Sequence, residues 1–219
     1  MGLRLHASLI FCDGFLYNNK ALVGALKKLG YADGRVAEAM LQVDRKDFVP
    51  GSEIEYAYLD TPLPIGYGVT TSAPSIVARM LLLLEVKKGM HILEIGVGSG
   101  YQTALLSRLV GEKGKVLGIE INPELVKFAD ANLEKYRLSN IEIVVGSGMH
   151  GYKKDAPYDR IIYSAALREI PQEAVNQLGE DGKLIAPVGD FYQTLILVEK
   201  KKGKEQRRNL DLVVFSPMM

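Results

Sequence analysis

The chain has 219 residues, and its 27 basic and 26 acidic side chains give a formal net charge of +1. This length suits one well-cored domain, and the near-neutral charge provides no global field for nucleic acid or for an acidic membrane. The single cysteine, Cys12, excludes an internal disulfide framework and offers no metal cluster. We therefore expect a cytoplasmic protein in a reducing compartment, without a bound metal.

Two helical patterns open the chain. Apolar residues recur at helical spacing over 20–29 and 35–43, and Gly30 closes the first pattern. The stretch before them is a poor secretion signal, because Asp13 interrupts its apolar patch. The run LLLLEV at 81–86 is far too short to span a bilayer, so we expect no membrane partner.

The segment 60–74, DTPLPIGYGVTTSAP, contains three prolines and two glycines. This composition predicts a shaped loop without regular secondary structure. A helix should follow through Leu84, with Ser72 as its N-cap and Pro74 in its first turn.

From His91 onward, short apolar runs alternate with amphipathic segments, and this alternation predicts a mainly parallel sheet covered by helices on both faces. Asn122 and Pro123 provide an N-cap and a first helical residue for one of the helices. The predicted strands are 91–95, 115–121, 141–146, 159–165, 183–189, 194–200 and 210–215, and the predicted helices are 100–110, 122–137 and 172–178.

The end of the chain is typical of a hairpin. The polar run KKGKEQRR at 201–208 separates the last two predicted strands, which we therefore expect to be antiparallel. The whole sequence predicts one α/β domain over 1–219, with an N-terminal helical extension at 1–60 and a doubly wound core at 61–219.

Three glycines, Gly96, Gly98 and Gly100, lie where a predicted strand passes into a helix. A dinucleotide fingerprint would place a further glycine where Tyr101 stands. The acid that ends the next strand, Glu120, follows Gly100 by 20 residues, which suits a carboxylate that accepts both hydroxyls of a ribose. The same residues would also serve a tight turn and a solvated strand end, but the placement of Glu120 favours a nucleoside site.

The segments LEIGVGSGYQTALLSRLVG and GKVLGIEINPELV resemble the first two motifs of S-adenosylmethionine-dependent methyltransferases with a Rossmann-like sheet. The upstream block DTPLPIGYGVTTSAPSIVARML, with APYDRIIYSAA, IPQEAVNQL and GKLIAPVG downstream, resembles the protein-L-isoaspartate O-methyltransferases over 26–217. The resemblance implies a repair enzyme with S-adenosylmethionine as cofactor. Its substrates would be damaged proteins and peptides, methylated on the α-carboxylate of L-isoaspartyl residues.

The resemblance also implies roles for individual residues. Ser72 corresponds to the active-site serine, which could also cap its helix. Where the family has Gly-Asp-Gly after the third strand, this chain has Ser147, which brings a hydroxyl to the adenine but no charge. Many members also continue beyond the last strand with residues that cover the cofactor, whereas this chain stops at Met219. The implied cofactor contacts are Ile65, Gly66, Tyr67, Gly68, Glu94, Ile95, Gly96, Val97, Gly98, Glu120, Ser147 and Gly148.

Two other functions fit parts of the sequence. A methyltransferase of the same fold could act on RNA through the basic run 199–208, but the 60–74 block and the neutral charge argue against a nucleic-acid partner. A catalytically weak module that only binds S-adenosylmethionine fits Ser147 and the short C-terminus.

Overall fold

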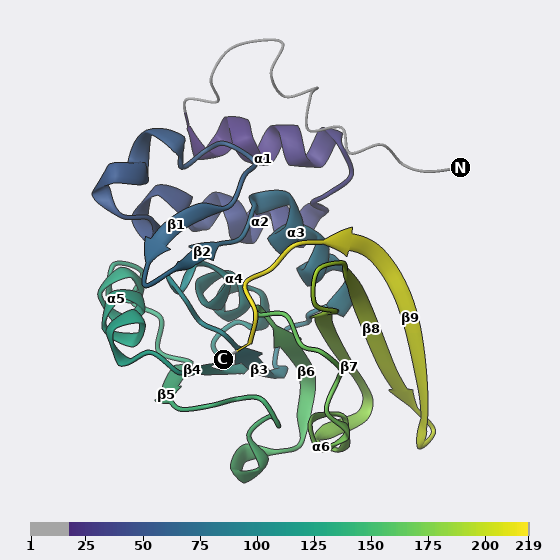
Figure 1. Cartoon of the computed structure of the whole chain (residues 1–219). Helices are drawn as coiled ribbons and strands as arrows, with labels where there is room; N and C mark the ends of the chain where they lie inside the picture. The colour runs from purple at the N-terminus through teal and green to yellow at the C-terminus, as the bar shows by residue number, and fades with distance from the viewer. Residues whose placement is uncertain (1–17, 219) are drawn as a thin grey trace.

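The computed structural model describes residues 18–218, so Cys12 and the stretch assessed as a secretion signal lie outside the described residues. It contains a seven-stranded sheet of order β5-β4-β3-β6-β7-β8-β9 (Figure 1). Strands β3 to β7 are parallel, while β8 and β9 are antiparallel. The predicted doubly wound sheet with antiparallel last strands is confirmed. The strands are β3 His91–Ile95, β4 Lys115–Glu120, β5 Ile141–Val145, β6 Tyr158–Tyr163, β7 Leu178–Val188, β8 Gln193–Lys201 and β9 Lys204–Val213.

The strand order creates a switch point between β3 and β6. From β3 the chain moves outward to β4 and β5, and it then returns to add β6 on the other side of β3. The connections that leave the carboxyl ends of β3 and β6 therefore diverge to opposite sides. In open α/β sheets, ligands bind in the crevice that this divergence leaves.

Helices cover both faces of the sheet, as predicted. One face packs against α1 to α5 in a single apolar cluster, and the other packs against α6 and nearby loops in a second cluster (Figure 1). None of the helices within residues 18–218 is long and apolar enough to cross a membrane. The helices are α1 Asn19–Lys28, α2 Gly34–Gln42, α3 Pro74–Leu84, α4 Tyr101–Val110, α5 Pro123–Glu134 and α6 Gln172–Asn176.

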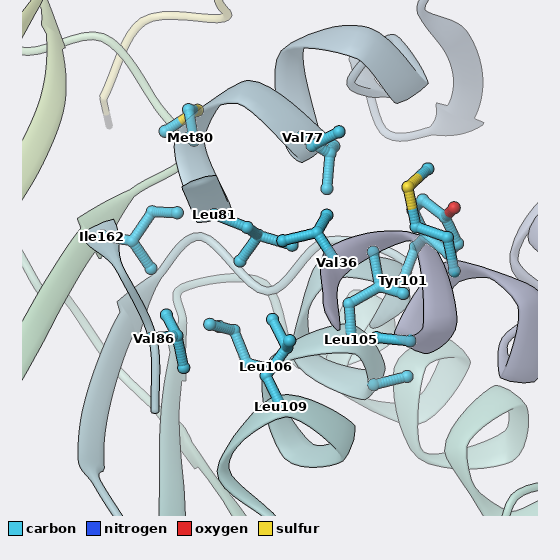
Figure 2. Packing of buried hydrophobic residues seen from close by; sticks show 14 of the residues in the cluster. Val36, Val77, Met80, Leu81, Val86, Tyr101, Leu105, Leu106, Leu109 and Ile162 are labelled. Carbon is cyan, nitrogen blue, oxygen red and sulfur yellow. The ribbon is translucent and has the colours of Figure 1, made fainter. Parts of the chain in front are cut away.

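The N-terminal helices share the core of the sheet. Figure 2 shows Val36 of α2 and Leu81 of α3 packed toward Leu105 and Leu106 of α4, with Ile162 of β6 beside them. All five side chains are almost fully buried. Burying one such aliphatic side chain stabilises the fold by about 1.5–3 kcal/mol, so α1 and α2 are held to the rest of the domain by an apolar interface.

Side-chain caps explain where several helices begin. Asn18 and Asp33 accept hydrogen bonds from backbone amides in the first turns of α1 and α2. Asn122 accepts from the amide of Glu124, with Pro123 at the first position of α5. The predicted N-cap of α5 is therefore confirmed.

The prediction that 60–74 is a loop without regular structure was wrong. Residues Leu63–Gly66 form β1 and Val69–Thr71 form β2, which pair antiparallel as a short hairpin. Proline in a two-stranded ribbon costs little, because the outer edge of each strand has no ladder partner. The hairpin turns at Gly66, Tyr67 and Gly68, all of which have positive φ.

The connection between the last two strands is also shorter than predicted. Lys201 pairs with Lys204, so the turn consists of Lys202 and Gly203 alone. The rest of the polar run 201–208 belongs to the strands, because β9 is an edge strand whose side chains are mostly exposed and can be polar.

Candidate active site

A cleft opens at the switch point, beyond the carboxyl ends of β3, β4 and β6. Its walls come from β2 and the start of α3, the turn after β3, the end of β4, the segment after β6 and the last residues of the chain that are described. Within residues 18–218, no group of three or more His, Cys, Asp or Glu side chains is arranged to hold a metal ion. The predicted site residues that line the cleft are Ser72, Glu94, Ile95, Gly96, Val97, Gly98, Glu120 and Gly148.

The glycine turn after β3 needs glycine for its backbone and for space. Gly98 has φ +56°, and a Cβ there would lie 3.3 Å from Ile65 Cδ1 of the hairpin. Gly100 has φ +85°, and a Cβ there would lie 3.3 Å from both Ala129 and Leu133 of α5. L-residues with side chains rarely adopt such positive φ values. The turn therefore brings backbone against the cleft, the hairpin and α5 at once.

Glu120 presents a fixed carboxylate at the end of β4. Its Oε2 accepts from the amide of Gly98 at 3.0 Å, and its Oε1 accepts from the amide of Asn122 at 3.0 Å. The residue is 6 % exposed, and it lines the cleft. Each carboxylate oxygen can accept more than one hydrogen bond. Both oxygens are thus held in place and can still accept from two neighbouring hydroxyls, as a ribose presents them.

Glu94 lies at the floor of the cleft and is fully buried. It accepts from Thr103 Oγ1 at 2.6 Å and from Gln102 Nε2 at 2.9 Å, and the same Gln102 amide donates to Ser164 Oγ at 2.8 Å. Burial raises the pKa of Glu94 to about 7, despite the opposing effect of these two hydrogen bonds. The carboxyl consequently links β3, the first turn of α4 and the end of β6.

Of the hairpin residues predicted to contact the cofactor, Ile65 lies against the glycine turn. Ile65 is buried against Gly98, whereas Tyr67 at the hairpin tip is 61 % exposed. Ile65, Gly66, Tyr67 and Gly68 are not among the residues that line the cleft, and the lining from this hairpin begins at Val69.

Ser72 lies between β2 and α3 and lines the cleft, but the prediction that it caps α3 was wrong. The N-cap position is Ala73, and the amide of Ser75 donates to Asp60 Oδ1 at 2.8 Å. A carboxylate 15 residues upstream therefore does the capping. The hydroxyl of Ser72 has no hydrogen-bond partner among the residues that the structure describes, which leaves it available to a ligand.

Ser147 lies at the rim. Gly146 and Gly148 on either side of it line the cleft, but Ser147 is exposed, and its Oγ faces the amide of Met149 at 3.5 Å. Gly148 packs so closely on Ile95 that an added Cβ would lie 2.8 Å from that side chain.

The lining residues that were not predicted from the sequence include Gln102 and the segment 214–218. Gln102 has a signal that could have been used, because it is a polar residue in the first turn of the helix that follows the glycine turn. The segment 214–218 has no such signal. It returns to the cleft because the amide of Ala166 donates to Ser216 O and the amide of Met218 donates to Ala166 O, both at 2.8 Å. Residues after β9 thus do cover part of the cleft.

The comparisons with known proteins agree with this geometry. The family model described as Protein-L-isoaspartate(D-aspartate) O-methyltransferase matches residues 17–219. The protein-L-isoaspartate O-methyltransferase of Methanococcus aeolicus is 42 % identical over 201 residues, which cover 91 % of this chain and 93 % of that protein. Protein-L-isoaspartate O-methyltransferase 2 of Archaeoglobus fulgidus is 46 % identical over 185 residues, 84 % of each chain.

A solved structure from Plasmodium falciparum is also similar. It is described as a protein-L-isoaspartate O-methyltransferase in complex with S-adenosyl-L-homocysteine. It superposes with a TM-score of 0.83 at 30 % identity and covers 92 % of this chain and 98 % of that one.

Proposed function

This chain belongs to the protein-L-isoaspartate O-methyltransferase family, and we propose that it carries out the family's reaction in the cleft between Ser72 and Glu120. The reaction transfers a methyl group from S-adenosylmethionine to the α-carboxylate of L-isoaspartyl residues in damaged proteins and peptides. One observation carries the assignment of roles: a free serine hydroxyl and a backbone-fixed carboxylate line the same cleft from different elements.

The residues at the switch point fit the cofactor. The oxygens of Glu120 would accept the two ribose hydroxyls, and the glycine turn at 96–98 would let the backbone approach the ligand closely. Gly148 would lie beside the adenine, with Ser147 at the rim. When bound, S-adenosylmethionine supplies an electrophilic methyl group on a positively charged sulfur.

The nucleophile requires no general base. A carboxylate is already ionised near neutral pH, so the chain has to orient it and remove its water. A neutral hydroxyl suits this task, because a cation would hold the nucleophile too tightly. The Ser72 hydroxyl donates one hydrogen bond to the carboxylate while the methyl group is transferred.

The test uses two peptides that differ only in one residue, L-isoaspartate or normal aspartate. We expect methylation of the first and none of the second, because the peptides differ in the path of the main chain and not in charge. Equal methylation of both, methylation of neither, or preferential methylation of an RNA transcript would refute the proposal.

A second measurement tests the role of Ser72. Ser72→Ala should lower the single-turnover rate by about 10- to 100-fold, the range expected from the loss of one hydrogen bond to a charged group. Cofactor affinity should stay near the wild-type value, because the hydroxyl acts on the nucleophile. An unchanged rate would remove Ser72 from the mechanism.

A further inference from the structure

A buried arginine lies behind Ser72. Arg45, the first residue of the 3₁₀ helix Arg45–Phe48, has no exposed surface and forms no ion pair with a carboxylate of the described chain. Instead, its guanidinium donates to four backbone carbonyls. Nη1 donates to Ala57 O at 2.9 Å and to Leu59 O at 3.1 Å, and Nη2 donates to Thr61 O at 2.9 Å and to Ser72 O at 3.1 Å.

These carbonyls lie at the base of the β1–β2 hairpin. Thr61 precedes β1 and Ser72 follows β2, so the single Nη2 atom ties together the two chain segments that enter and leave the hairpin. Between Leu59 and Thr61, Asp60 caps α3 through the amide of Ser75. The main chain on both sides of the Ser72 hydroxyl is therefore fixed, by Arg45 at its own carbonyl and by Asp60 at the helix that follows.

Only a guanidinium can satisfy this set of carbonyls. Burying a cation without an anion is unfavourable unless several strong hydrogen bonds compensate, and the rigid planar fork of arginine reaches carbonyls in diverging directions. Burial lowers the pKa of Arg45 to about 10, so the group is still charged at neutral pH. Lysine keeps the charge at this position but provides a single nitrogen, which cannot reach both pairs of carbonyls.

We propose that Arg45 is a positioning residue of the methyl transfer, which holds the backbone of Ser72 so that the hydroxyl points at the substrate carboxylate. This inference rests on the role proposed above for Ser72. It assigns to the N-terminal helical extension a part in the reaction, because Arg45 comes from that extension and does not itself line the cleft.

The test is a double-mutant cycle on the single-turnover rate, measured per folded molecule with saturating cofactor and an L-isoaspartyl peptide. Arg45→Lys should lower the rate by about 10- to 100-fold, because small misplacements of a catalytic group have effects of this size. In the Ser72→Ala background, the same substitution should have almost no further effect. Cofactor affinity should stay near the wild-type value in all variants. Arg45→Gln, which removes the buried charge, completes the cycle if Arg45→Lys does not fold.

Arg160 of β6 provides the matched control. It is 5 % exposed, and its guanidinium also donates to backbone carbonyls, those of Leu84, Asp159 and Asp181, none of which lines the cleft. Arg160→Lys should lower the melting temperature and leave the rate per folded molecule unchanged.

Three results would overturn the inference: a wild-type rate in Arg45→Lys, an equal loss of rate in Arg160→Lys, or losses for Arg45 and Ser72 that multiply in the double variant. Multiplying losses would mean that Arg45 acts independently of the hydroxyl. An unchanged rate in Ser72→Ala alone would instead refute the proposed role of Ser72, and the inference with it.

Discussion

The buried carboxyl of Glu94 should make stability depend on pH, and Glu94→Gln should remove that dependence. Glu94 is fully buried between β3 and α4, where Thr103 and Gln102 donate to it. Burial raises its pKa from 4.5 to about 7. A glutamine keeps the shape of the side chain without a charge, and the Thr103 hydroxyl can turn to accept its N–H.

The sign follows from proton binding in the two states. Between about pH 4.5 and pH 7 the unfolded chain has released the Glu94 proton, while the folded chain retains it. The free energy of unfolding therefore falls as pH rises through this range and becomes constant above it. Each unit of pKa shift corresponds to about 1.4 kcal/mol, so the total contribution is about 3 kcal/mol.

The assay is urea unfolding of wild type and Glu94→Gln without cofactor, at several pH values from about 5 to about 8. The stability of the variant relative to wild type should rise across this range and level off near pH 7. Glu112→Gln, which changes an exposed carboxylate, should leave the wild-type pH profile nearly unchanged. Parallel profiles for wild type and Glu94→Gln would refute the reasoning.

Three further predictions concern individual side chains. Glu120→Ala should weaken cofactor binding by about 1.5–3 kcal/mol, the scale of hydrogen bonds to a charged group, as measured by calorimetry; unchanged affinity would contradict its assignment to the ribose. Ser147→Asp should tighten binding by about 0.5–1.5 kcal/mol through one added hydrogen bond at the rim, and weaker binding would show that the pocket is adapted to serine. Asp60→Ala should lower the free energy of unfolding by about 1 kcal/mol through loss of the α3 cap, whereas Ser72→Ala should not; the opposite pattern in urea titrations would restore Ser72 as the cap.

Local sequence patterns were sufficient to predict much of the fold. The alternation of apolar runs and helical segments predicted the parallel sheet, and Asn122 with Pro123 predicted the start of α5. The helix start could be predicted because it depends on contacts within a few residues, and the sheet because the periodicity of each strand and helix is a local pattern. The glycine turn was predictable for the same reason, since strand, turn and helix are contiguous in the sequence.

Contacts between distant segments could not be predicted in this way. Ser72 is a good N-cap residue by its type, but nothing near it in the sequence indicates that Asp60 reaches the first turn of α3 instead. The return of 214–218 to the cleft depends on where β9 lies in the sheet. Arg45 resembles any surface arginine of an amphipathic segment until four carbonyls are found around it.

The chemistry explains why two separately anchored parts of the chain meet at this site. A reaction without a general base depends on alignment, so the groups that hold the cofactor and the nucleophile must be rigid relative to each other. Backbone amides fix Glu120 on the sheet, while Arg45 fixes the segment that carries Ser72. Ile65 of the hairpin packs against Gly98 of the glycine turn and joins the two parts directly. The apolar core shared by α2, α3 and α4 joins these helices to the sheet, and alignment is thereby built into the fold.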